Sequence, residues 1–149
     1  MTIMKSPYVH ALFVGGFTLF YAGLFYFTAN HMELNSMLAN GTLNSSFWNG
    51  LTQFIGAGNM KYVSYIMLLL LAVFLAVTLF KQQKRYDEYQ MSILTKLIIV
   101  AGVVSMIMLP LMFFMVLSDP NYLVETLFLF ITVQWLSVLI GNVFYTIKY

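Results

Sequence analysis

Residues that can do chemistry are sparse in this chain. It has two histidines, His10 and His31, five acidic residues and no cysteine. Without cysteine the protein can form neither disulfides nor thiolate metal sites. No nucleophile, base and orienting residue stand together in a pattern typical of covalent catalysis. The sequence therefore predicts that the protein is not an enzyme, and it gives no reason to expect a cofactor.

Haem is one cofactor that the two histidines could bind. They belong to or border the same predicted helix and lie 21 residues apart, which is ~31 Å at 1.5 Å per residue. They cannot both ligate one haem iron within a monomer, so only a dimer that pairs His10 with its copy would serve. A haem-binding membrane subunit is therefore a minor alternative. We interpret His10 as a polar residue near one membrane interface and His31 as a loop residue beyond the other.

The last apolar segment contains three candidate intramembrane polar residues, Glu125, Gln134 and Ser137. An ion or proton path usually needs an ionisable group at depth in the membrane. Glu125 is expected one turn inside a helix, where the helix dipole favours a carboxylate and where it still reaches water. Gln134 and Ser137 share a helix face with Gly141, and we interpret them as hydrogen-bonding groups between helices. A small oligomeric transporter or channel lined by Glu125, Gln134 and Ser137 is the main alternative function.

The densest run of charge lies between two long apolar segments. It runs from Lys81 to Gln90, and its candidate functional residues are Lys81, Lys84, Arg85, Asp87, Glu88 and Gln90. Asp87 and Gln90 are three residues apart just before an apolar run, which predicts a capping box, and Glu88 adds a favourable charge to the first helical turn. Lys84 and Arg85 can lie near anionic lipid headgroups, each contributing about 1 kcal/mol. The same six residues are a candidate docking surface for a cytoplasmic partner.

The composition indicates whether the chain lies in water or in a membrane. Of its 149 residues 61% are hydrophobic and 8% are charged, whereas a soluble domain carries about 25% charged residues. The net charge of +2 is too small to indicate a nucleic-acid surface. We therefore predict an all-α integral membrane four-helix bundle, with residues 1–149 forming a single transmembrane domain.

Four apolar segments, at about 8–28, 62–80, 91–117 and 121–145, are long enough to cross ~30 Å of hydrocarbon. Strips of small residues let a neighbouring helix approach closely. These strips are Ala11, Gly15, Thr18 and Ala22 in the first segment, Ala72 and Ala76 in the second, and Ala101 and Ser105 in the third. Pro110 lies within the third segment and frees the carbonyl of Met106, so we expect a kink there.

A short amphipathic helix is predicted at residues 46–56, between the first two spans. Its apolar face holds Phe47, Trp48, Leu51, Phe54 and Ile55, at helical spacing. Ser46 is the expected N-cap, and Gly56 and Gly58 end the helix. We favour a helix that lies in the membrane interface over a lid that covers a site. The loop before it contains glycosylation sequons at Asn40 and Asn44.

Basic residues indicate the orientation. Lys5, Lys81, Lys84, Arg85 and Lys148 fall on one side of a four-span layout, and Glu33, Asp119, Glu125 and the lone Lys61 fall on the other. Cytoplasmic loops carry the excess of Lys and Arg. We therefore expect a multi-pass protein of the cell membrane whose termini and central loop are cytoplasmic.

The run from Arg85 to Gln90, between the second and third spans, resembles a group of small uncharacterised four-span membrane proteins from Gram-positive bacteria and archaea. These proteins carry an Asp-Glu-Arg-Gln signature at this place. Asp87, Glu88 and Gln90 match it, and Tyr89 stands where the group has Arg. The group has no assigned activity, and its members are often encoded beside small DNA-binding regulators. The resemblance implies a regulatory or accessory membrane role and no catalytic residue.

The leading functional hypothesis follows from the small-residue strips. We expect a non-enzymatic accessory, regulatory, immunity or complex-assembly subunit that acts through helix packing. Its partners would be the lipid bilayer and either another membrane protein or a second copy of the chain. Nucleic acid is not expected among them.

Overall fold

The computed structural model describes residues 6–29, 37–38, 45–81 and 85–149. Within these residues the elements are α1 (Pro7–Thr28), α3 (Ser46–Gly56), α4 (Met60–Lys81), α5 (Glu88–Ser118), the 3-10 helix η2 (Pro120–Tyr122) and α6 (Leu123–Lys148). No strand occurs among them, so the all-α prediction is confirmed. The predictions made for Lys5, His31, Lys84 and the sequons at Asn40 and Asn44 lie outside the described residues.

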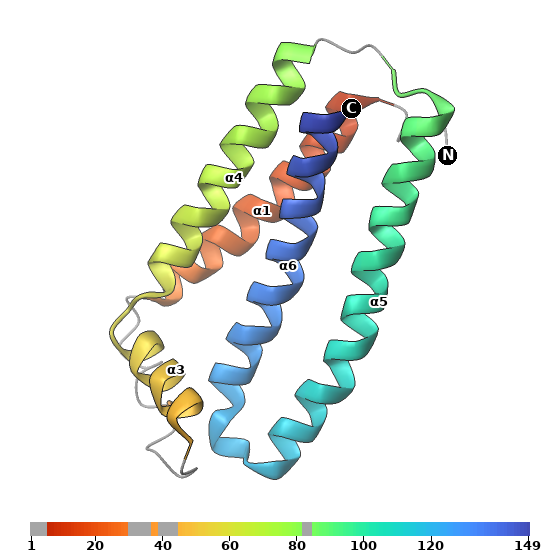
Figure 1. The fold of residues 1–149 in the computed structure, drawn as a ribbon. Coiled ribbons are helices and arrows are strands. Elements are labelled where there is room, and N and C mark those ends of the chain that lie inside the picture. The colour runs from red at the N-terminus through yellow and green to blue at the C-terminus, as the bar shows by residue number, and fades with distance from the viewer. Residues whose placement is uncertain (1–5, 30–36, 39–44, 82–84) are drawn as a thin grey trace.

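Four described segments are long and apolar enough to cross a membrane: α1, α4, α5, and η2 continued by α6. They coincide with the four predicted spans, with α5 starting three residues earlier and α6 ending three residues later. The start of α1, the end of α4, the start of α5 and the end of α6 share one end of the molecule, and α3 lies at the other (Figure 1). We call these the terminal end and the α3 end.

The most extensive contact between two helices is that of α1 with α4. Gly15, Thr18 and Ala22 of α1 are buried. A Cβ at Gly15 would meet the side chain of Leu71 of α4 at 3.9 Å, and the Thr18 hydroxyl accepts from Trp135 of α6 at 3.0 Å. The hydroxyl of Ser64 donates to the backbone carbonyl of Ala22 at 2.8 Å. A side chain that reaches a carbonyl on the next helix requires close backbone approach. The small-residue strip predicted for α1 is therefore confirmed.

The strip predicted for α4 is wrong for this packing. Ala72 and Ala76 are exposed. The buried residues of α4 are Met60, Ser64, Met67, Leu71 and Phe74, which recur at spacings of four, three, four and three. Larger side chains of α4 thus fill the space beside the small residues of α1, because a small residue is needed on only one of the two helices for close packing.

The longest helix, α5, has 31 residues and buries only Leu94. It packs mainly on α6 and η2, and Figure 1 shows it alongside α6, away from α1 and α4. The helix continues through Pro110 without a break. The four spans therefore form a packed group of three helices, α1, α4 and α6, with α5 attached through α6.

The ends of two helices test local predictions. The capping box at the start of α5 is confirmed: Asp87 accepts from the Gln90 backbone N–H at 2.7 Å, and the Gln90 side chain accepts from the Asp87 N–H at 3.1 Å. The N-cap of α3 is Ser45, not the predicted Ser46, and its side chain makes no cap hydrogen bond. Beyond α3, Gly58 has a φ of 71°, and a Cβ there would lie 3.0 Å from the Ala29 carbonyl oxygen. That turn therefore requires glycine.

Candidate functional site

A polar cluster at the terminal end joins three parts of the chain. His10 of α1 contacts the side-chain oxygen of Asn142 of α6 through Nε2 at 2.8 Å, and the Tyr86 hydroxyl through Nδ1 at 3.1 Å. The Asn142 amide nitrogen donates to the Val138 carbonyl at 2.9 Å, so its oxygen faces His10 as an acceptor. Nε2 of His10 therefore carries the hydrogen, and Nδ1 accepts from Tyr86. We call His10, Tyr86 and Asn142 the His10 cluster.

Tyr86 holds the α4–α5 connection against the end of the bundle. Its side chain is buried, with only 7% of its surface exposed, and its ring meets that of Tyr145 edge-on at 5.9 Å. Loss of solvent raises the pKa of the Tyr86 hydroxyl to about 12, because burial disfavours the phenolate. Sequence reasoning missed this anchor. The available signal was a lone aromatic residue between the basic run and the capping box.

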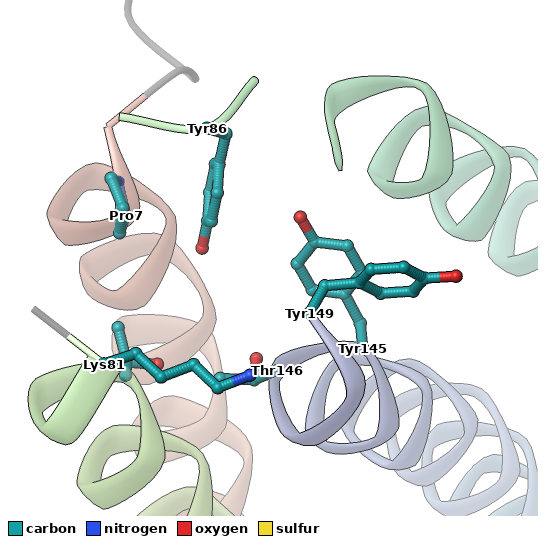
Figure 2. A pocket seen from close by; sticks show the side chains of 7 residues that line it. Pro7, Lys81, Tyr86, Tyr145, Thr146 and Tyr149 are labelled. Atoms are coloured by element: carbon teal, nitrogen blue, oxygen red, sulfur yellow. The ribbon is translucent and has the colours of Figure 1, made fainter. Parts of the chain in front are cut away.

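A shallow pocket beside the His10 cluster is lined by Pro7, Thr78, Lys81, Tyr86, Tyr145, Thr146 and Tyr149. Figure 2 shows Lys81 reaching from α4 toward Thr146 at the end of α6, with Tyr86 above and the two C-terminal tyrosines opposite. The Lys81 ammonium donates to the Ile147 carbonyl at 3.2 Å, a favourable place for a cation because the helix dipole is negative there. The hydroxyls of Thr78 and Thr146 donate to backbone carbonyls of their own helices. The pocket therefore lies where the ends of helices meet, and the polar groups of Lys81, Thr78 and Thr146 that line it already donate to backbone carbonyls.

The predicted docking residues that the structure describes lie together at the terminal end. Lys81, Arg85, Asp87 and Glu88 are exposed, and Gln90 is half-buried. The last of these also donates to the Tyr149 carbonyl at 3.4 Å. Part of this polar surface therefore fixes α5 to the end of α6, and its exposed charges remain open to a partner.

Glu125 corrects a prediction. The carboxyl lies in the first turn of α6 as expected, but its side chain is fully enclosed, with 0% exposed, so it does not reach water. The hydroxyl of Thr52, on α3, donates to Glu125 Oε1 at 2.7 Å. A carboxyl leaves water at small cost only where donors replace the lost hydration, and α3 brings one of them.

The short helix α3 covers Glu125. Trp48 meets the ring of Tyr122 at 5.4 Å, and Ile55 is buried in the core with 1% exposed. Phe47, expected on the buried apolar face, is 57% exposed. The helix α3 therefore turns part of its apolar face and the polar side chain of Thr52 toward the bundle, where Thr52 meets the carboxyl of Glu125. Sequence reasoning named α3 as a lid only as the second interpretation.

The three polar candidates of α6 do not line one path. Gln134 donates to the Ser105 hydroxyl of α5 at 2.7 Å, which is the interhelical hydrogen bond expected of it. Ser137 is exposed and donates to the Gln134 carbonyl at 2.8 Å. Glu125 and Gln134 are nine residues apart, which places them on opposite sides of a helix, ~180° around its axis. One of them faces α3 and the other faces α5.

Both ring nitrogens of His10 are engaged in hydrogen bonds, so binding a haem iron would require breaking one of them. In the described part of the chain, no three acidic or histidine side chains gather as a metal site would require. No protein-family model, curated protein or solved structure matches the sequence.

Two places in the described part of the chain hold the polar groups most capable of chemistry. They are the His10 cluster and the enclosed carboxyl of Glu125.

Proposed function

We propose that this chain is a non-enzymatic membrane subunit that acts through helix packing, with α5 as the helix that contacts a partner helix. One observation carries the proposal: α5 buries a single residue, Leu94, along 31 positions. The helices α1, α4 and α6 each bury a strip of residues against one another. A long helix with contacts along one side has most of its surface available to a neighbour within the membrane.

The chemistry of the α5 surface supports a membrane-embedded partner. Its exposed side chains are almost all apolar over the middle of the helix, and they include Ile98, Ile99, Val103, Met106, Ile107, Phe113, Phe114 and Leu117. An apolar surface of this extent is typical of a membrane or protein interaction site. Gly102 is exposed among them, and a Cβ there would meet no atom within 4 Å. A glycine at this depth lets the backbone of a second helix come close.

The orientation proposed for this subunit places the terminal end in the cytoplasm of the cell. The described basic residues Lys81, Arg85 and Lys148 lie at that end, where the positive-inside rule expects them. Lys61 is at the opposite end, in the first turn of α4. The exposed charges around Arg85 and Glu88 would then be accessible to a cytoplasmic protein that regulates the subunit.

Cysteine crosslinking tests the proposal directly because the natural chain has no cysteine. Gly102→Cys on α5 and Gly16→Cys on α1 form a matched pair: both glycines are exposed within a span, and a Cβ at either would meet no atom within 4 Å. Each variant is expressed at native level and treated in intact membranes with a short, membrane-soluble bis-maleimide. We expect a crosslinked product from Gly102→Cys and none from Gly16→Cys.

The mass of the product identifies the partner as a second copy of the chain or as a different membrane protein with its own cysteine. A cysteine-free partner is captured by replacing the bis-maleimide with a thiol-to-photoreactive crosslinker. If neither reagent gives more product at Gly102 than at Gly16, lipid covers α5 and the proposed role of this helix is wrong.

A further inference from the structure

The enclosed carboxyl of Glu125 has no part in the partner contact proposed for α5. Asp87 and Glu88 are exposed, whereas Glu125 has no surface in contact with solvent. Enclosing a carboxyl away from water costs free energy unless hydrogen-bond donors replace its lost hydration. An ionisable side chain within a membrane span is by default a candidate functional group.

The groups around Glu125 suit a carboxyl that gains and loses a proton. The Thr52 hydroxyl donates to Oε1, and this oxygen can accept the bond in either charge state. Asn49 lies three residues before Thr52 on the same face of α3, and its side-chain oxygen is buried with no hydrogen-bond donor among the described residues. Protonation of Glu125 brings a new O–H donor to an interface that contains this unfilled acceptor. Ionisation removes that donor.

Polar and charged groups on the neighbouring elements define the rest of this environment. Tyr122 of η2 is 1% exposed, and its carbonyl accepts from the Thr126 hydroxyl of α6 at 2.7 Å. Asp119 precedes η2, where it caps the Asn121 N–H at 3.1 Å, and Lys61 is in the first turn of α4, where it lies over the ring of Tyr62. The hydrogen bond that reaches the Glu125 carboxyl from α3 comes from an uncharged group, the Thr52 hydroxyl.

The cover itself is an 11-residue helix in which Ile55 is the buried residue. The bond from Thr52, the ring contacts of Trp48 with Tyr122 and of Phe54 with Phe128, and the packing of Leu51 and Ile55 attach α3 to the bundle. A turn that requires glycine at position 58 joins it to α4. Elements with few buried contacts open at lower free-energy cost than the core. Displacement of α3 would expose Glu125 to water without separating the long helices.

We propose that Glu125 is a proton-exchange site and that α3 is the lid that controls its access to water at the α3 end. The ligand is the proton itself. The lid gives the site two states: an enclosed carboxyl bonded to Thr52, and an open one in exchange with bulk water.

Infrared spectroscopy of the protein in lipid tests for the proton. A carboxylic-acid carbonyl band that disappears reversibly as pH rises, and that is absent from Glu125→Gln at every pH, is the expected result. Asp119→Asn is the matched control at the same end of the molecule and should retain the band. If the pH-dependent band persists in Glu125→Gln, or if no such band is found, the proton site is wrong.

Carbodiimide labelling tests the lid. The acid O–H adds across a C=N bond of the reagent, and the adduct rearranges to a stable N-acylurea whose mass increase is read by peptide mapping. A water-soluble carbodiimide should label Glu125 at least about tenfold more slowly than exposed Glu88, since it must wait for local opening. Thr52→Val removes the hydrogen bond to Glu125 and should reduce the difference in labelling rate between Glu125 and Glu88 severalfold. In Thr52→Ser and Phe47→Ala, Glu125 should be labelled at the same rate as in the natural protein.

Equal labelling of Glu125 and Glu88 in the natural protein would show that α3 is not a lid. The same conclusion follows if Phe47→Ala accelerates labelling as much as Thr52→Val does, since the Phe47 side chain is 57% exposed and has no hydrogen-bond donor to offer the carboxyl. Because neither readout involves a partner, failure of these experiments leaves the proposed role of α5 standing, and failure of the crosslinking leaves this site standing.

Discussion

The α1–α4 and α5–α6 pairs are both long, apolar and antiparallel neighbours, yet they are held in different ways. In the first pair the backbones come so close that Ser64 bonds to the carbonyl of Ala22 across the interface. In the second pair the mid-span polar contact runs between two side chains, Gln134 and Ser105, and a bond to a backbone carbonyl, from the Tyr145 hydroxyl to Gln90, lies at the terminal end. The two pairs also differ in burial, because α4 buries five residues along its length and α5 buries Leu94.

The neighbours of the glycines do not separate the two pairs. A Cβ at Gly141 of α6 would meet the end of the Leu97 side chain of α5 at 3.3 Å, and a Cβ at Gly15 of α1 would meet the end of the Leu71 side chain of α4 at 3.9 Å. The difference lies at Ala22 of α1, which is 2% exposed and whose carbonyl accepts from Ser64 of α4. The first pair should therefore resist enlargement at Ala22, whereas the mid-span bond between Gln134 and Ser105 should tolerate change.

Enlarging Ala22 should have the largest effect on stability. Ala22 is 2% exposed, so Ala22→Leu forces α1 and α4 apart and removes the Ser64 bond, with an expected loss of about 3 kcal/mol of unfolding free energy. Unfolding in mixed detergent micelles measures it. Gly16→Leu, on the exposed side of the same helix, is the control and should cost little. Equal losses in both variants would remove the distinction between close and loose packing.

Removing the Tyr86 hydroxyl should have an intermediate effect. Tyr86→Phe leaves His10 Nδ1 without its donor and should cost about 1.5 kcal/mol at neutral pH. The pKa of Tyr86 is raised to about 12 in the folded protein, from ~10 in an unfolded chain. The stability that this difference contributes is complete below about pH 10 and is lost as pH rises toward about 12.

The Tyr86→Phe variant should therefore lose less stability than the natural protein over that alkaline interval, although other tyrosines titrate in both. Unfolding free energies measured in parallel for the two proteins provide the check. If their alkaline profiles have the same slope, Tyr86 is not the buried anchor of the α4–α5 connection.

The smallest effect is expected at the α5–α6 contact. Gln134→Leu removes the bond to Ser105, whose hydroxyl still donates to the Ala101 carbonyl at 2.9 Å, so no donor is stranded. Hydrogen bonds between membrane helices contribute ~0.6 kcal/mol on average, and we expect a loss of this size in the same micelle assay. A loss as large as that of Ala22→Leu would make α5 an equal member of the packed group.

The parts of the fold that the sequence predicted depend on local information. Length and hydropathy define each span within a few residues, and the capping box of Asp87 and Gln90 involves neighbours along one turn. The strip of α1 was recognisable because small residues are informative on an apolar helix. For α4 both faces are apolar, so the positions of Ala72 and Ala76 led to the wrong prediction of which face packs on α1.

The polar sites depend on contacts that no local pattern contains. The bond between His10 and Asn142 joins residues 132 positions apart, and the bond between Thr52 and Glu125 joins residues 73 positions apart. Glu125 was expected to reach water because only its own helix was considered. Its enclosure results from α3, whose polar face carries the donor that the carboxyl needs.

The length of α5 has a consequence for the kind of membrane that suits the protein. Its 31 residues extend ~46 Å at 1.5 Å per residue, whereas the 22 residues of α1 and of α4 extend ~33 Å, close to the ~30 Å thickness of the hydrocarbon layer. A thin bilayer leaves α5 with surplus apolar length, which it accommodates by leaning. Because α5 packs mainly on α6 and η2, it can change its tilt while the other spans keep theirs. Bilayer thickness then sets the angle at which the exposed face of α5 is presented.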